Sequence, residues 1–66
     1  MGYRLKEIRE EKKMTQEELE RRSGISRQTI SAIENDRMGN VMVGTLLALA
    51  NALDTTIDSL FFEKAV

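Results

Sequence analysis

The stretch Thr15–Asn35 reads TQEELERRSGISRQTISAIEN and carries the signals of two short helices joined by a tight turn. Thr15 is followed three residues later by Glu18, a capping-box pattern that predicts the start of a helix. Gly24 suits the left-handed residue that ends many helices, so this helix is predicted to stop at about Ser23. The stretch therefore opens with a helix that is bounded at both ends by residues suited to those places.

Ser26 predicts the start of the next helix, because a serine hydroxyl can accept a hydrogen bond from the unpaired backbone N–H groups of a first turn. This helix is predicted to end near Asn35. Two helices joined by a short turn that contains glycine form a helix-turn-helix, whose second helix enters the major groove of DNA. The residues predicted to hold the two helices at a fixed crossing are Leu19, Ile25, Ile30 and Ile33.

The outward side of the second helix carries residue types that suit the reading of DNA bases. An arginine such as Arg27 can bond to guanine O6 and N7, and a glutamine such as Gln28 can bond to adenine N6 and N7. Hydroxyl groups and alanine can contact bases or the thymine methyl group. Simple solvation of a helix surface is the alternative explanation. We expect base reading by Arg27, Gln28, Thr29, Ser31 and Ala32.

Apolar residues at helical spacing predict further helices on both sides of this stretch. A first helix is predicted over roughly Tyr3–Lys13 and a fourth over about Val43–Leu53. Thr56 is suited to cap a short fifth helix, Ile57–Phe61. The tail, residues 62–66, is ambiguous in sequence, and an extended strand that pairs with a second copy is one alternative.

The predicted helices are too short to persist alone in water, so all of them must share one core. A chain of 66 residues is sufficient for one domain, and we expect a single domain over residues 1–66. A loop is predicted over residues 37–42, where Gly39 and Asn40 mark a turn. The predicted core comprises Leu5, Ile8, Met14, Leu19, Ile25, Ile30, Ile33, Val43, Leu46, Leu49, Leu53, Ile57, Leu60 and Phe61.

The composition argues against several classes of site. The chain has no Cys and no His, so disulfides are excluded, and we expect no metal and no cofactor. With His and Cys absent, the remaining candidates are weak: the Asp and Glu residues lie on amphipathic helix faces, and Ser26 and Ser31 have no candidate base apart from Lys or carboxylates. An enzyme is therefore not expected. No apolar run approaches the roughly 20 residues of a membrane span, and the first residues lack the apolar core of a signal peptide. We therefore expect a cytoplasmic protein without membrane contact.

The net charge of −1 is low for a domain that binds nucleic acid, since many such domains are strongly basic. The charges are unevenly distributed, however. Residues 21–40 hold four Arg against one Glu and one Asp, a balance of +2, whereas residues 41–66 hold one Lys against three acidic residues, a balance of −2. A local positive surface can serve DNA even when the whole chain is nearly neutral, and we expect a modest affinity for a single copy.

Several sequence motifs occur in the order and spacing of one known group of regulators. Over residues 4–61 the chain resembles the Cro/C1-type helix-turn-helix family, the phage-repressor-like or XRE group. The resemblance implies an all-α, five-helix lambda-repressor-like DNA-binding domain in which helices 2 and 3 form the helix-turn-helix. The matching motifs are Arg4–Arg9 (RLKEIR), Met14–Leu19 (MTQEEL), Ser23–Ser26 (SGIS), Thr29–Ser31 (TIS), Ile33–Asn35 (IEN) and the segments Thr45–Leu47 and Ala52–Leu53.

The same resemblance implies roles for residues outside the reading surface. Thr15 and Gln16, at the start of helix 2, would contact the DNA backbone, where free backbone N–H groups also favour anions. Arg9 and Glu34 match positions that form an internal salt bridge between helices 1 and 3, with two unrelated surface charges as the alternative. Further backbone contacts are implied for Asn35, Arg37 and Asn40.

The chain departs from the family pattern at three places. Glu20 stands where a small residue is usual, so its side chain either clashes at the helix crossing or turns outward to pair with a neighbouring Arg. Asp54 stands where Gly often ends helix 4, although Asp tolerates left-handed backbone better than most residues. Val41 and Met42 replace the common Pro-Ser start of helix 4.

These observations predict a sequence-specific transcriptional regulator, a repressor, that binds double-stranded DNA at a palindromic operator as a homodimer. No small-molecule effector is predicted, because no second domain is expected to hold one. The alternative is an antitoxin or protein-interaction module of a toxin–antitoxin or mobile-element system. A small helical bundle without a specific function is a further, less favoured interpretation. The predicted dimer patch comprises Met42, Leu47, Phe62 and Val66.

Overall fold

The computed structural model describes residues 4–35, 37 and 41–61. Within these residues the chain forms five α-helices and no strand, as predicted. Their bounds are α1 (Leu5–Glu11), α2 (Gln16–Ser23), α3 (Arg27–Glu34), α4 (Val43–Ala52) and α5 (Ile57–Phe61). The predicted turn at Gly39 and Asn40 and the tail 62–66 lie outside the described residues.

The first helix is shorter than the predicted range Tyr3–Lys13. It ends at Glu11, and Lys13 adopts a left-handed backbone with φ of 56°. The N–H groups of Lys13 and Met14 then donate to the carbonyls of Glu10 and Arg9, which closes the turn toward α2. An apolar-spacing pattern does not mark this end, because Lys is common inside helices and rare in the left-handed region.

The ends of α2 lie where the sequence predicted them. The Thr15 hydroxyl accepts the N–H of Glu18 at 3.0 Å, and Gly24 has φ of 77° with its N–H donating to the Glu20 carbonyl at 2.9 Å. The Glu18 carboxylate pairs with Arg22 at 2.8 Å, and no hydrogen bond from the Thr15 N–H to Glu18 is found in the described residues. Only half of the predicted capping box is therefore formed.

The third helix is also capped as predicted. The Ser26 hydroxyl accepts the N–H of Thr29 at 3.2 Å and donates to the Thr29 hydroxyl at 3.0 Å. At the other end, the side-chain amide of Asn35 donates to the Ser31 carbonyl at 2.8 Å. The start and the end of α3 are thus both fixed by side chains close in sequence, so this helix is well defined even though it is short.

One core joins the helices and matches the predicted set closely, except that Val43 lies outside it and Ala50, which was not predicted, lies within it. Val43 is 69% exposed, because it begins α4 and the later turns of that helix supply the inward side chains. Ile25 and Ile57 are partly buried at the edge of the core, and the side chain of Phe61 lies outside the described residues. The buried residues are Leu5, Ile8, Met14, Leu19, Ile30, Ile33, Leu46, Leu49, Ala50, Leu53 and Leu60.

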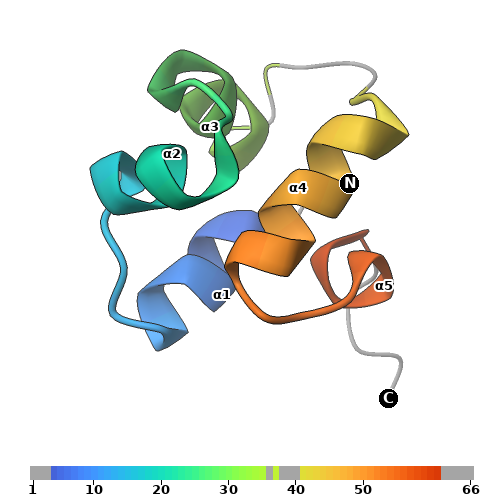
Figure 1. Ribbon diagram of the computed structural model, residues 1–66, viewed down its shortest axis with the longest axis horizontal. Coiled ribbons are helices and arrows are strands. Elements are labelled where there is room, and N and C mark those ends of the chain that lie inside the picture. The colour runs from blue at the N-terminus through green and yellow to red at the C-terminus, as the bar shows by residue number, and fades with distance from the viewer. Residues whose placement is uncertain (1–3, 36, 38–40, 62–66) are drawn as a thin grey trace.

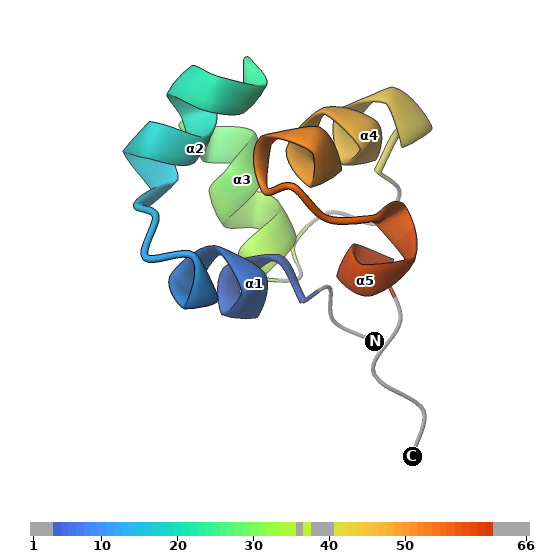
Figure 2. The same ribbon diagram turned by 60° about the horizontal axis from the view of Figure 1, so that its bottom comes forward.

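The helices pack in two groups, with α1, α2 and α3 on one side and α4 and α5 on the other (Figure 1). Helix α4 joins the groups, because it packs against both α2 and α5. In the turned view, α3 lies between α1 and α4 (Figure 2). The backbone N–H of Arg4 donates to the Leu60 carbonyl at 2.9 Å and so ties the start of α1 to α5.

The turn between α4 and α5 uses Asp54 in place of glycine. Asp54 has φ of 53°, which is the left-handed conformation expected at this position. The Thr55 N–H donates to the Ala50 carbonyl at 2.9 Å, and the Thr56 hydroxyl caps α5 by accepting the N–H of Ser59 at 3.1 Å. None of the described helices is long and apolar enough to cross a membrane.

Candidate DNA-binding site

An open groove of about 490 Å³ lies along the outward side of α3. Gln16 enters it from the start of α2 and Arg37 from the segment that follows α3. The other residues lining it are Arg27, Gln28, Ser31 and Ala32, all on α3. Side chains that are far apart in the sequence therefore share one concave surface, which is composed of residues predicted to contact DNA.

Arg27 and Gln28 occupy the first turn of α3 and are exposed. Within the described residues, neither side chain makes a hydrogen bond or an ion pair with the protein. A guanidinium and a primary amide in this state keep all of their donors for an external partner. Thr29 differs, because it is partly buried and its hydroxyl is bonded to Ser26 at 3.0 Å, and it does not line the groove.

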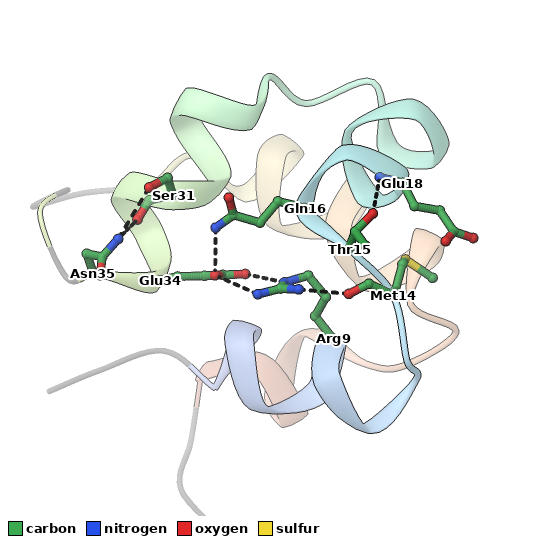
Figure 3. A network of polar contacts seen from close by, with 8 residues as sticks. All are labelled: Arg9, Met14, Thr15, Gln16, Glu18, Ser31, Glu34 and Asn35. Carbon is green, nitrogen blue, oxygen red and sulfur yellow. Dashed lines mark hydrogen bonds and ion pairs between the residues drawn. The ribbon is translucent and has the colours of Figure 1, made fainter.

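A charged cluster connects α1 with α3 (Figure 3). The Arg9 guanidinium bonds to both carboxylate oxygens of Glu34, at 2.7 Å and 3.2 Å, which is the predicted salt bridge. Arg9 also donates to the Met14 carbonyl at 2.7 Å. The two side chains are only 11% and 2% exposed, so the pair is shielded from water. The hydrogen bond that Arg9 donates to Glu34 raises the pKa of Arg9 and keeps its positive charge in place.

Gln16 belongs to the same cluster, which the sequence did not indicate. Its amide Nε2 donates to Glu34 Oε1 at 2.9 Å, so Glu34 accepts from side chains of both α1 and α2 (Figure 3). An amide nitrogen carries two hydrogens, and one of them stays available to a phosphate oxygen. The cluster thus holds Gln16 at the edge of the groove, and Arg9 and Glu34 fix α1, α2 and α3 relative to one another.

The two described residues at the end of α3 have separate environments. The Asn35 amide is occupied by Ser31, at 2.8 Å to the carbonyl and 3.3 Å to the hydroxyl. Arg37 is exposed at the groove, and its backbone N–H donates to the Ala32 carbonyl at 2.8 Å. Arg37 therefore lines the groove, whereas the Asn35 amide is bonded within α3. Asn40 lies outside the described residues.

Glu20, which stands where the family usually has a small residue, follows neither of the two alternatives predicted from sequence, a clash or a pairing with an Arg side chain. The carboxylate Oε2 accepts the backbone N–H of Arg27 at 2.9 Å. It makes no ion pair within the described part of the chain, and the side chain is partly buried at the crossing of α2 and α3. Glu20 thus neither forces the helices apart nor pairs with a guanidinium, and instead links α2 to the start of α3.

Two packed helices joined by a short turn that contains Gly24, as α2 and α3 are, define a helix-turn-helix. A family model described as helix-turn-helix matches residues 5–60. The chain belongs to this family, in the Cro/C1-type group to which its motifs point. No group of metal-binding side chains occurs among the described residues.

Three curated proteins illustrate the relationship. The chain is 36% identical over 66 residues to the immunity repressor protein of Bacillus phage phi105, covering 100% of this chain and 45% of that protein. It is 47% identical over 53 residues to the uncharacterized HTH-type transcriptional regulator y4dJ of Sinorhizobium fredii, and the match covers 80% of this chain and 68% of that protein. It is 37% identical over 62 residues to the HTH-type transcriptional repressor RghR of Bacillus subtilis, and the match covers 94% of this chain and 46% of that protein. The chain thus spans about half of the length of two of these relatives.

A solved structure gives the same result for the fold. A chain of the SinR protein/SinI protein complex superposes with a TM-score of 0.85 and 30% sequence identity. The match covers 92% of this chain and 59% of the other. The arrangement of the five helices in the described part of the chain is therefore that of a lambda-repressor-like helix-turn-helix domain.

Proposed function

We propose that this protein is a sequence-specific DNA-binding transcriptional regulator that acts as a repressor. The observation that carries the proposal is the groove along α3, where Arg27 and Gln28 keep all of their side-chain donors unused. Curated relatives are named as repressors or as transcriptional regulators, which supports the same role. A regulator of this kind works where cellular DNA is accessible, so a cytoplasmic location is part of the proposal.

In the proposed complex, α3 lies in the major groove with its first turn nearest the base edges. Arg27 and Gln28 read bases, while Ser31 and Ala32 contact bases further along the same helix. Thr29 supports the cap and contacts DNA at the margin of this surface. Phosphate contacts fix the register of the domain without reading sequence, and we assign them to Thr15, Gln16, Asn35, Arg37 and Asn40.

Selection from a random duplex library tests this assignment. The wild-type chain is expected to select a defined sequence at low salt. Arg27→Ala and Gln28→Ala are each expected to lower affinity for that sequence by about 1–3 kcal/mol and to relax the choice of base at one position. Gln16→Ala is expected to weaken binding to all sequences alike. The measurement is the dissociation constant for the selected duplex and for a scrambled duplex.

Two outcomes would count against the assignment. If the wild-type chain selects no sequence, the regulator function is wrong. If Arg27→Ala and Gln28→Ala lower affinity for selected and scrambled duplexes equally, these residues contact the backbone and do not read bases. Gln28→Met provides a matched control in the same place, because it keeps the length of the side chain and its lack of charge but removes the donors that an adenine N7 requires.

The exposed apolar residues of α4 and of its N-cap, Met42, support a homodimer as part of the proposal. Met42 is 78% exposed and Leu47 is 49% exposed, and Val43 adds a side chain that is 69% exposed. Phe62 and Val66, the other members of the predicted dimer patch, lie outside the described residues. Two copies would present two α3 helices to half-sites about one DNA turn apart, which matches a palindromic operator.

Leu47→Gln tests the dimer without changing charge. We expect it to weaken binding to a duplex with two half-sites by at least about tenfold, because the second domain no longer binds as part of a pair. Binding to a duplex with one half-site is expected to be unchanged. Equal effects on both duplexes would exclude Leu47 from the dimer contact.

The same exposed residues favour a second candidate, a protein-interaction module, which is the role that an antitoxin would use. The structurally similar SinR chain comes from a complex with a different protein, SinI. Sedimentation of the purified chain separates the two candidates, because a homodimer forms without any partner. A chain that stays monomeric at all concentrations and on DNA would favour the protein partner.

A further inference from the structure

Glu20 lies where the reading helix begins, although it belongs to α2. Its Oε2 accepts the backbone N–H of Arg27 at 2.9 Å, the first residue of α3. The second hydrogen bond at this end is made by Ser26, whose hydroxyl accepts the N–H of Thr29 at 3.2 Å. Backbone donors of the first turn of α3 are therefore bonded to acceptors of the protein itself.

The position matters because a helix N-terminus attracts anions. The unpaired N–H groups and the helix dipole together act as a partial positive charge of about half a unit. In this chain, the carboxylate of Glu20 occupies that end of α3. No cation pairs with the carboxylate within the described residues, so its full negative charge is directed at the helix end and its surroundings.

The groove begins at the same helix end, since Arg27 and Gln28 line it. DNA that binds there brings many phosphate charges toward Glu20. Repulsion between like charges lowers the affinity for every duplex, and it is strongest at low salt, where the screening length is longest. The low net charge of the chain, −1, offers little compensation from elsewhere.

We infer that Glu20 is an internal anion that positions the start of α3 and weakens the binding of DNA by a single domain. This inference rests on the proposed function. The positioning role and the effect on DNA binding depend on different properties of the Glu20 side chain. The acceptor oxygen holds the Arg27 N–H, and the negative charge opposes the DNA phosphates, so the two can be separated by substitution.

Glu20→Gln separates them, because a glutamine oxygen can still accept the Arg27 N–H while the charge is lost. We expect this variant to bind a duplex of random sequence about fivefold more tightly at low salt. The gain is expected to shrink as salt is added. Glu11→Gln is the matched control, because Glu11 is exposed at the end of α1, a helix with no residue in the groove. Its affinity is expected to stay within about twofold of wild type.

The positioning part has a readout that does not depend on DNA. Hydrogen exchange of the Arg27 amide is expected to be at least about fivefold faster in Glu20→Ala, which has no acceptor, and unchanged in Glu20→Gln. Equal exchange in all three proteins would overturn the positioning role. A gain in affinity that is the same for Glu20→Gln and Glu11→Gln would overturn the charge role, because net charge alone would explain it.

These results are distinguishable from a failure of the proposed function. If the wild-type chain binds DNA and Glu20→Gln binds no more tightly than Glu11→Gln, only this inference fails. If neither the wild-type chain nor Glu20→Gln binds any duplex at low salt, the DNA-binding function fails and the charge role fails with it.

Discussion

Arg9→Ala is expected to lower the free energy of unfolding by about 3–5 kcal/mol, because it leaves a buried carboxylate without its charged partner. The Glu34 side chain is 2% exposed, and Arg9 supplies two of the three hydrogen bonds that it accepts from side chains. The amide of Gln16 alone cannot compensate a buried charge. At about 0.05–0.15 kcal/mol per residue, a domain of 66 residues is stable by only about 3–10 kcal/mol, so the substitution is expected to remove a large part of the total stability. Urea denaturation followed by circular dichroism measures the change.

Two further variants make this expectation specific to the buried pair. Arg22→Ala removes an arginine from an exposed pair with Glu18, where the side chains are 56% and 30% exposed, and is expected to cost about 0.5 kcal/mol or less. The double variant Arg9→Met, Glu34→Leu removes both charges and is expected to recover most of the lost stability. A loss below about 1 kcal/mol for Arg9→Ala would mean that the pair does not hold α1 on α3.

Ile30→Ala is expected to destabilise the domain by about 2–5 kcal/mol. Ile30 is 0% exposed and lies in the middle of α3, so truncation leaves a cavity where α3 meets the core. Stability is lost for two reasons: less apolar surface is buried on folding, and the side chains around the cavity lose their van der Waals contacts with Ile30. Thermal and urea denaturation give the change in free energy.

Gln28→Ala is the control for this second variant, because it shortens an exposed side chain in the same helix and is expected to change stability by about 0.5 kcal/mol or less. If Ile30→Ala and Gln28→Ala lower the free energy of unfolding by comparable amounts, α3 is not held in place by its packing against the core. Ile30→Val, which removes a single methylene, is expected to cost about 0.5–1.5 kcal/mol and so to fall between them.

The features that sequence predicts well in this protein are those decided by neighbouring residues. Thr15, Ser26 and Thr56 cap helices as predicted, because a cap needs only a side-chain acceptor and an N–H group within three residues. Gly24 and Asp54 likewise take left-handed conformations for local steric reasons. Caps and left-handed residues of this kind can be predicted from sequence without knowledge of how the helices pack.

The features that sequence missed depend on contacts between helices. The bond from Gln16 to Glu34 joins residues 18 positions apart, and the bond from Glu20 to the Arg27 N–H requires the crossing of α2 and α3. Val43 has the spacing of a core residue, yet the direction of α4 leaves it exposed. The Arg9–Glu34 pair was anticipated only through the family resemblance, since 25 residues separate its members.

The hydrogen bond between the Arg4 N–H and the Leu60 carbonyl, 2.9 Å long, brings the beginning and the end of the described fold together. Neither α1 nor α5 contributes a residue to the groove. A polypeptide can therefore enter and leave this domain at one place, as domains that tolerate insertion into other proteins commonly do. Such a unit can form one domain of a longer chain, and the groove along α3 can stay unchanged when the neighbouring domains differ.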